Sequence, residues 1–238
     1  MNREPWKGVM RVMGKNRWVG GLALVLLALL ASLRVLAQGA EAPKVRVEGD
    51  ARAWKEMTSA WKGLQDLRGY RTRQRSADGT LEMVFESERT PQGRALRIVT
   101  TVRHGGQEIR SETVLLGNQA WQVMSMPGGG GTCRPIPLDW VPPGPFAFPG
   151  TGEGRAGEEV VWARRVGPGT SPKGAAVTVY EWRSRWADEA EWKVTGTLHV
   201  DRASGLPVWM TFEAEGQRFT VEYYDFNAPV RVTKPAGC

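Results

Sequence analysis

Few residues in this 238-residue chain have the type and spacing that chemistry at a site requires. Gly152, Gly154 and Gly157 match the spacing of a dinucleotide-binding fingerprint, but they lead into a predicted strand, whereas that motif must open a helix. His104 lies beside a predicted turn, and His199 falls on the polar face of a predicted strand. Neither histidine has a partner fixed by spacing. The sequence therefore predicts no catalytic residue, no metal ligand and no cofactor, and we expect a protein that is not an enzyme.

The two cysteines, Cys133 and Cys238, are the remaining groups with distinctive chemistry. A disulfide between them would require an oxidising compartment. It would tie the C-terminus to the middle of the chain and close a loop of about 100 residues, which stabilises by roughly 4–5 kcal/mol in the chain-entropy model. Pairing is the favoured interpretation. Two separate thiols are the alternative, because sequence does not show whether the Cβ atoms meet.

The first 37 residues have the parts of a secretory signal peptide. A basic segment contains Arg3, Lys7, Arg11, Lys15 and Arg17. An apolar run over residues 18–33 follows, and Val35 and Ala37 occupy the −3 and −1 positions of a cleavage site. We predict cleavage after Ala37, because the run is shorter than the ~20 residues of a membrane-spanning helix. The mature protein would then be periplasmic or otherwise extracytoplasmic; anchoring by an uncleaved N-terminal segment is the alternative.

The charge of the chain belongs largely to this signal segment. The whole chain carries +7, and residues 1–37 account for +5 of it, with six basic residues and one acidic residue. The remaining +2 lies on residues 38–238, which we expect to form a single domain. A nucleic-acid-binding domain needs a basic stripe on its folded surface. We therefore expect no nucleic-acid partner.

Residues 192–230 are predicted to form three consecutive antiparallel strands, because apolar and polar side chains alternate with the period of a half-buried strand. The same pattern predicts strands over residues 70–75, 81–88, 95–103, 108–116, 119–126, 158–165 and 175–186, with a hairpin loop at 167–174. Short Gly- and Asn-containing links between most of them allow only antiparallel neighbours. Asp50 is placed as the N-cap of an amphipathic helix over residues 51–67. Residues 41–48 are expected to be a polar lead-in.

Residues 127–157 interrupt the strand pattern with a dense run of proline and glycine. Proline removes backbone donors, so neither a long helix nor a central strand fits here. The segment still contains the aromatic residues Trp140, Phe146 and Phe148. Long ordered loops with such content serve as lids or binding elements. We expect residues 128–150 to be a lid loop; a loop that only caps the core is the alternative.

The order of these elements resembles the LolA/LolB-type lipoprotein-carrier superfamily, which includes the LppX/LprG lipid-binding lipoproteins and the RseB sensor domain. The resemblance covers roughly residues 51–235. Its best-matching residues are Trp61, Leu64, Tyr70, Trp121, Asp201, Gly205, Leu206, Pro207, Tyr224, Phe226, Asn227, Pro229 and Val230. Two departures are the proline-rich loop, where the family usually has a helical lid, and the absence of the lipobox cysteine that LolB, LppX and LprG carry.

The resemblance implies a mainly β fold with α: a strongly curved antiparallel half-barrel of about ten strands, with an N-terminal helix and the mid-chain lid. It implies an exported carrier that holds lipid or lipoprotein acyl chains in a hydrophobic cavity. Its partners would be donor and acceptor proteins of the cell envelope, and we expect a monomer. A sensor or interaction module of the RseB kind is the alternative. Arg71, Arg73 and Arg97 are candidates for a basic residue at the cavity rim.

The strand patterns also predict which side chains line the cavity. A curved sheet with one apolar face and one helix would leave apolar surface open, and such surface usually marks a binding site. The residues expected to contact lipid are Trp61, Met83, Phe85, Leu96, Ile98, Trp121, Val123, Trp140, Phe146, Phe148, Trp182, Val194, Leu198, Met210, Phe212, Phe219 and Val221.

Overall fold

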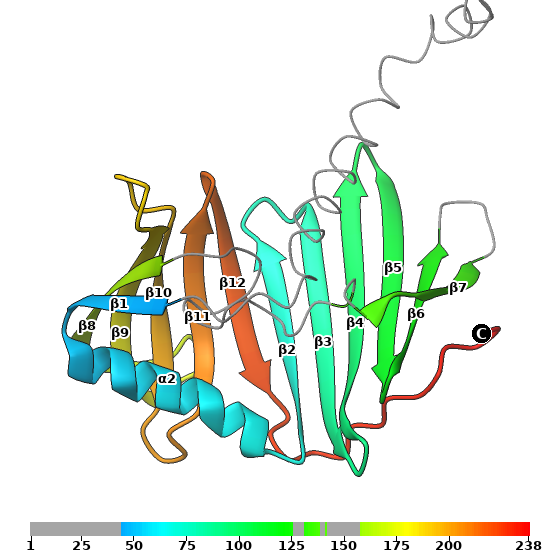
Figure 1. Cartoon of the computed structure of the whole chain (residues 1–238), viewed down its shortest axis with the longest axis horizontal. Coiled ribbons are helices and arrows are strands. Elements are labelled where there is room, and N and C mark those ends of the chain that lie inside the picture. The colour runs from blue at the N-terminus through cyan, green and yellow to red at the C-terminus, as the bar shows by residue number, and fades with distance from the viewer. Residues whose placement is uncertain (1–43, 126–130, 139–140, 142–157) are drawn as a thin grey trace, which may run out of the picture.

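The computed structural model describes residues 44–125, 131–138, 141 and 158–238 of the chain (Figure 1). These residues form one helix and a single sheet of twelve strands. The helix is α2 (Ala51–Asp66), and the strands are β1 (Lys44–Gly49), β2 (Gly69–Ser76), β3 (Leu81–Thr90), β4 (Gly93–His104), β5 (Gln107–Leu116), β6 (Gln119–Ser125), β7 (Thr132–Ile136), β8 (Glu158–Thr170), β9 (Ala176–Trp186), β10 (Val194–Asp201), β11 (Pro207–Ala214) and β12 (Gln217–Tyr224).

The sheet confirms the expected fold class, a mainly β half-barrel with an N-terminal helix. Its strand order is β1-β8-β9-β10-β11-β12-β2-β3-β4-β5-β6-β7, with β1 and β7 at opposite ends, so the sheet is open. The strands from β2 to β6 are joined by tight turns, as between β4 and β5, where Gly105 and Gly106 have φ angles of 58° and 77°. A two-residue hairpin turn requires positive φ at both positions, which glycine adopts without steric cost.

Two strands were missed by the sequence patterns, which predicted about ten where the sheet has twelve. β1 was expected to be a polar lead-in; it pairs in parallel with β8, more than a hundred residues away, and alternation over six residues could not reveal that partner. β7 lies inside the predicted loop and contains Pro135. Because β7 is an edge strand, its proline removes no ladder donor that a neighbour needs.

The hairpin loop predicted over residues 167–174 is also partly wrong. β8 continues to Thr170 and stays paired with β9 as far as Ala176. The register shifts between Arg165 and Gly167, which marks a β-bulge. A bulge inserts an extra residue without ending the strand, so the glycine and proline that follow were misread as a turn.

The helix α2 begins and packs as the sequence predicted. The Asp50 carboxylate accepts hydrogen bonds from the backbone N–H groups of Arg52 and Ala53, at 2.9 and 3.1 Å. The helix ends at Asp66, one residue before the predicted end. Its buried side chains are Ala53, Met57, Ala60 and Leu64, spaced so that they share one face. Among the described residues, no helix is long and apolar enough to cross a membrane.

The two faces of the sheet have different coverings. α2 lies across one face, over the half of the sheet that contains β8 to β11 (Figure 1). We call this the helix face. The opposite face carries the C-terminal residues 229–238 and is called the tail face. There Val230 and Val232 pack with the buried residues Ala95 and Val114. Because successive side chains of a strand point to opposite faces, the strand register assigns each residue to one of them.

The C-terminal segment is fastened to the tail face at several points. The backbone N–H of Val232 donates to the Glu88 carboxylate at 2.9 Å. The Lys234 ammonium lies 5.1 Å from the centre of the Trp121 ring. Cys133 of β7 and Cys238 form a disulfide, with their Cα atoms 5.5 Å apart. The pairing that the sequence favoured therefore holds the end of the chain against the edge of the sheet.

Candidate functional site

Half of the helix face is a packed core beneath α2. Tyr180, Trp182, Leu198, Met210, Phe212 and Val221 of β9 to β12 are buried in one cluster with the apolar face of the helix. Trp61, Val194 and Phe219 are partly buried and pack against this cluster. Eight of the residues predicted to contact lipid thus lie together. They fill the space under α2, where burial between helix and sheet stabilises the fold.

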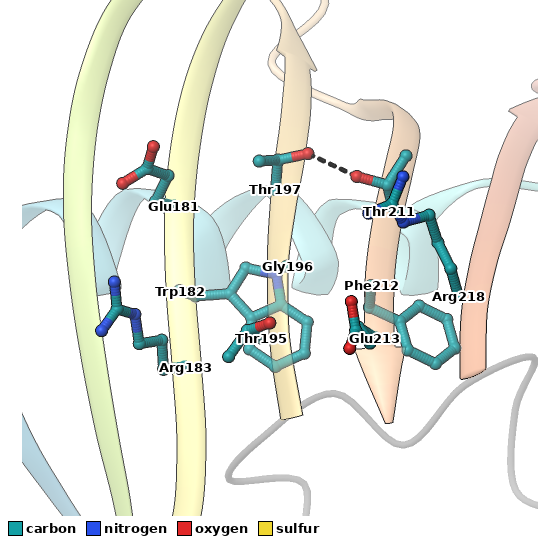
Figure 2. A pocket seen from close by; sticks show the side chains of 10 residues that line it. All are labelled: Glu181, Trp182, Arg183, Thr195, Gly196, Thr197, Thr211, Phe212, Glu213 and Arg218. Atoms are coloured by element: carbon teal, nitrogen blue, oxygen red, sulfur yellow. Dashed lines mark hydrogen bonds between the residues drawn. The ribbon is translucent and has the colours of Figure 1, made fainter. Parts of the chain in front are cut away.

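Close packing in this core depends on Gly196 of β10. Trp182 is almost fully buried, and its indole ring lies beside Gly196 in the close-up of Figure 2. A Cβ atom at Gly196 would lie 2.9 Å from two carbons of that ring and 2.6 Å from the Thr211 carbonyl oxygen. Only glycine lets the ring and the neighbouring strand approach this closely. The site under α2 is thus built for packing rather than for an open cavity.

A groove of about 360 Å³ lies over the same strands. α2 lies behind the strands in Figure 2, and the polar side chains that line the groove belong by register to the tail face. These side chains are Glu181, Arg183, Thr195, Thr197, Thr211, Glu213 and Arg218. Thr197 and Thr211 share a hydrogen bond of 2.7 Å, and Arg164 pairs with Glu181 at 2.6 Å. The groove is polar and its charges balance, so it does not suit an acyl chain.

A second groove, of about 560 Å³, lies between α2 and the ends of β9 and β10. Charged and polar side chains make up most of its lining, and the Tyr180 hydroxyl donates a hydrogen bond of 2.8 Å to Glu56. Burial, together with the hydrogen bond and charge of Glu56, raises the pKa of Tyr180 to about 12. Tyr180 therefore stays protonated and ties the helix to the sheet. Within the described residues no cluster of His, Cys, Asp and Glu could hold a metal ion.

The other half of the helix face carries an apolar stripe on β3 to β6. Phe85 and Ile98 are directly opposite each other on β3 and β4, and Met83 and Leu96 lie one step away along the same face. Phe85, Leu96 and Ile98 are buried, and Met83 is half-buried. The principal contacts of α2 are with β8, β1 and β10, so the stripe continues past the helix. Four predicted contact residues therefore belong to one continuous apolar stripe on the helix face.

The same stripe contains residues that were not among the predicted lipid contacts, although the strand patterns align Leu81 with Met83 and Val102 with Ile98. The register adds Leu81, Val102, Ile109, Leu115 and Met124 to this face. All five are half-buried. On β5, Ile109, Ser111, Thr113 and Leu115 alternate along one side of the strand, and this alternation places Ile109 and Leu115 on the same face. The hydroxyls between them made the strand look polar on both faces.

Trp121 and Val123 are not part of this stripe. They lie opposite Val114 and Glu112 of β5, which the register assigns to the tail face. Trp121 packs there against the C-terminal segment. Their alignment with each other was predicted correctly, but the face was wrong. The side chains of β6 on the helix face are those of Ala120, Gln122 and Met124.

The three arginines considered for the cavity rim also lie on the tail face. Arg71 pairs with Glu86 at 2.8 Å and with Asp225 at 2.6 Å, and Arg97 pairs with Glu86 at 2.9 Å. Arg73 lies 3.5 Å from Glu82. Burial acts to raise the pKa of Glu86, but hydrogen bonds from Arg97 and Arg71 outweigh it and hold the pKa below its ordinary value. These arginines are members of an ion-pair ladder, not of the rim.

Arg94 is a basic residue that does lie on the helix face, at the border of the stripe. Its guanidinium donates to the carbonyl oxygens of Leu64, Gln65 and Leu67 at 2.8–3.0 Å, and to Ser87 Oγ at 2.7 Å. Unpaired carbonyls at a helix C-terminus attract cations. Arg94 therefore fastens the end of α2 to β4. Burial lowers its pKa from the ordinary value.

The remaining predicted contacts, Trp140, Phe146 and Phe148, lie outside the described residues, as does most of the predicted lid over residues 128–150. Of that segment the structure describes β7 and its flanks. Ile136 and Val141 are buried there in a small cluster with Ala120, next to the half-buried Leu115. This cluster extends the helix-face stripe to the β7 edge.

Comparisons with solved structures identify the architecture. LprF from Mycobacterium bovis matches with a TM-score of 0.50 and 14% identity, over 79% of this chain and 99% of that one. The lipoprotein LppX of Mycobacterium tuberculosis matches with a TM-score of 0.50 and 12% identity, over 78% and 100%. A LolA superfamily protein from Nitrosomonas europaea has a TM-score of 0.24 and 13% identity, over 74% and 97%, a score too low to argue from.

No family model matches the sequence, and no curated protein matches it. The likeness is therefore one of structure, at identities where it establishes the fold alone. LppX is one of the proteins that the sequence resemblance named, and its whole length is covered. The chain shares the fold of LprF and LppX.

Proposed function

We propose that this protein is an exported carrier that binds the acyl chains of a lipid or lipoprotein along the apolar stripe of β3 to β6. The observation that carries the proposal is the continuation of the apolar helix face beyond the helix that covers its other half. The fold and the N-terminal segment support it. In this proposal residues 1–37 are removed on export, residues 38–238 are the carrier, and donor and acceptor envelope proteins load and unload it.

The energetics of such a site suit reversible transfer. Burying an acyl chain gains ~0.8 kcal/mol per CH₂ relative to water. A membrane offers nearly the same gain, so exchange between membrane and protein has a small net free energy. A carrier needs this balance, because ligand that is bound too tightly is not released.

Two neighbouring residues of β3 allow a matched test of the stripe. Met83 lies on the helix face and Val84 on the tail face, and both are half-buried. Met83→Gln should weaken binding of a fluorescent fatty acid by about tenfold, because a polar amide in an apolar site loses roughly 1–2 kcal/mol. Val84→Gln should leave the affinity unchanged. Equal effects of the two substitutions would show that the stripe is not the binding surface.

The ligand itself can be sought in purified mature protein by organic extraction and mass spectrometry. The proposal expects acyl lipid in the extract and displacement of the fluorescent fatty acid by it. A protein that yields no lipid and binds no fatty acid, but captures an envelope protein in stoichiometric amount, would instead be an interaction module of the RseB kind.

A further inference from the structure

Three buried polar groups belong to neighbouring residues on the helix face, at the border between the packed core and the stripe. They are the Thr72 hydroxyl, the Gln74 side-chain carbonyl and the Tyr223 hydroxyl, which we call the polar trio. None of the three has a hydrogen-bond partner within the described part of the chain. Leaving a buried polar group unpaired is costly, and folded proteins rarely do so. Three such groups on neighbouring residues indicate a partner that is not among the described residues.

The strand register places the three residues of the polar trio next to one another on the helix face. Thr72 of β2 and Tyr223 of β12 are directly opposite each other, and Gln74 lies two residues further along β2 on the same face. Opposite side chains in a sheet have Cβ atoms about 4.5–5.5 Å apart, and next neighbours along one face lie about 7 Å apart. The three side chains are therefore immediate neighbours on one face, and one ligand lying along that face would pass all of them.

The neighbours of the polar trio connect it to the stripe. Phe85 lies opposite Thr72, and Met83 lies opposite Gln74, both on β3. On the other side, Trp61 of α2 packs edge-on against Tyr223, with ring centres 5.6 Å apart. Burial holds the pKa of Tyr223 well above its ordinary value, and nearby Tyr70 adds to the shift, so the phenol remains a donor.

Resting on the proposed function, we propose that the polar trio binds the amide linkage of an N-acylated ligand whose chain lies along the stripe. The hydroxyls of Thr72 and Tyr223 donate to the amide carbonyl, and the Gln74 carbonyl accepts from the amide N–H. An ester offers only acceptors and leaves Gln74 unpaired, and a plain hydrocarbon leaves all three unpaired. An N-acylated lipid and an N-acylated lipoprotein both supply the required group.

The test compares N-ethylpalmitamide with ethyl palmitate, two ligands of equal length that differ in N–H against O. Each is used to displace a fluorescent fatty acid from the mature protein. Wild type should bind the amide about tenfold more tightly, because the ester leaves a buried acceptor unpaired. Gln74→Met keeps the side-chain length but removes the acceptor, so the amide-to-ester ratio should fall to about one. The ratio within one variant does not depend on the fraction of protein that is folded.

Two tyrosine variants give a matched pair. Tyr223→Phe should weaken amide and ester binding alike, by about fivefold, because it removes a donor that both ligands use. Tyr224→Phe removes the same hydroxyl from the tail face, where Tyr224 lies opposite Arg71, and should change neither affinity. An equal loss of affinity in the two variants would show that the substitutions act through the stability of the protein and not through contact with the ligand.

The outcomes separate this inference from the proposed function. Equal affinity for amide and ester in wild type, with both displacing the probe, would overturn the amide assignment and leave the carrier function standing. An amide preference that survives Gln74→Met would overturn it as well. Failure of every acyl ligand to bind would overturn both. A separate measurement distinguishes the two sources of an N-acylated ligand. Mild alkaline methanolysis cleaves esters but leaves amide-linked acyl chains in place. Amide-linked chains found in the solvent extract would come from a lipid, and those found on a copurified protein would come from a lipoprotein.

Discussion

Removing the Cys133–Cys238 disulfide tests both the stability of the fold and the assignment of its faces. The disulfide joins residues 105 apart in the sequence and holds the C-terminal segment on the tail face. The double substitution Cys133→Ser with Cys238→Ser removes the bond while changing the side chains little. Cys238 is exposed and Cys133 is half-buried, so two hydroxyls can be accommodated at these positions.

The expected loss follows from the size of the loop. In the chain-entropy model a loop of 105 residues gives about 4.7 kcal/mol at 25 °C. A domain of about 200 residues loses roughly 2–4 °C of Tm for each kcal/mol. The double variant should therefore melt roughly 10–19 °C below the wild type. Val230 and Val232 can still pack on Ala95 and Val114, so the variant should remain folded at 25 °C.

The assay is thermal melting and urea denaturation of wild type and double variant, each followed by fluorescence of the tryptophans. Wild type treated with reductant should match the double variant, which controls for the serines themselves. Affinity for a fluorescent fatty acid should be unchanged, because the disulfide and the stripe lie on opposite faces. A loss below about 1 kcal/mol would refute the loop-entropy reasoning. A collapse of affinity in folded protein would refute the assignment of faces.

Two further substitutions probe the packing and the charges. Gly196→Ala should lower the free energy of unfolding by about 1–3 kcal/mol, measured in urea, because its methyl group meets the Trp182 ring and the Thr211 carbonyl; an unchanged midpoint would contradict the close approach. Glu86→Gln should cost about 1–3 kcal/mol at pH 7, because it breaks charged hydrogen bonds to Arg71 and Arg97. The pKa of Glu86 is lowered in the fold, so its contribution is present above the ordinary carboxyl pKa and is lost as pH falls. The difference from wild type should therefore shrink below about pH 4, and a difference that persists in acid would contradict the pairing.

Local patterns in the sequence determined most of the elements. Alternation predicted strands that match β2 to β6 and β9 to β12 closely and the first part of β8, and Asp50 marked the start of α2. Such features depend on neighbours within a few residues, where side-chain period, capping and glycine turns act directly. β1 and β7 were not predicted, because each depends on a partner strand or an edge position that no local pattern records.

Only the tertiary structure decided which face of each strand is covered, and by what. A period of two shows that Trp121 and Val123 share a side, as Met83 and Phe85 do, but it does not show that the two pairs lie on opposite faces. That choice depends on the register of the intervening strands and on the packing of α2 and the C-terminal segment. A shift of one residue in register would exchange the faces, and only contacts between distant parts of the chain prevent it.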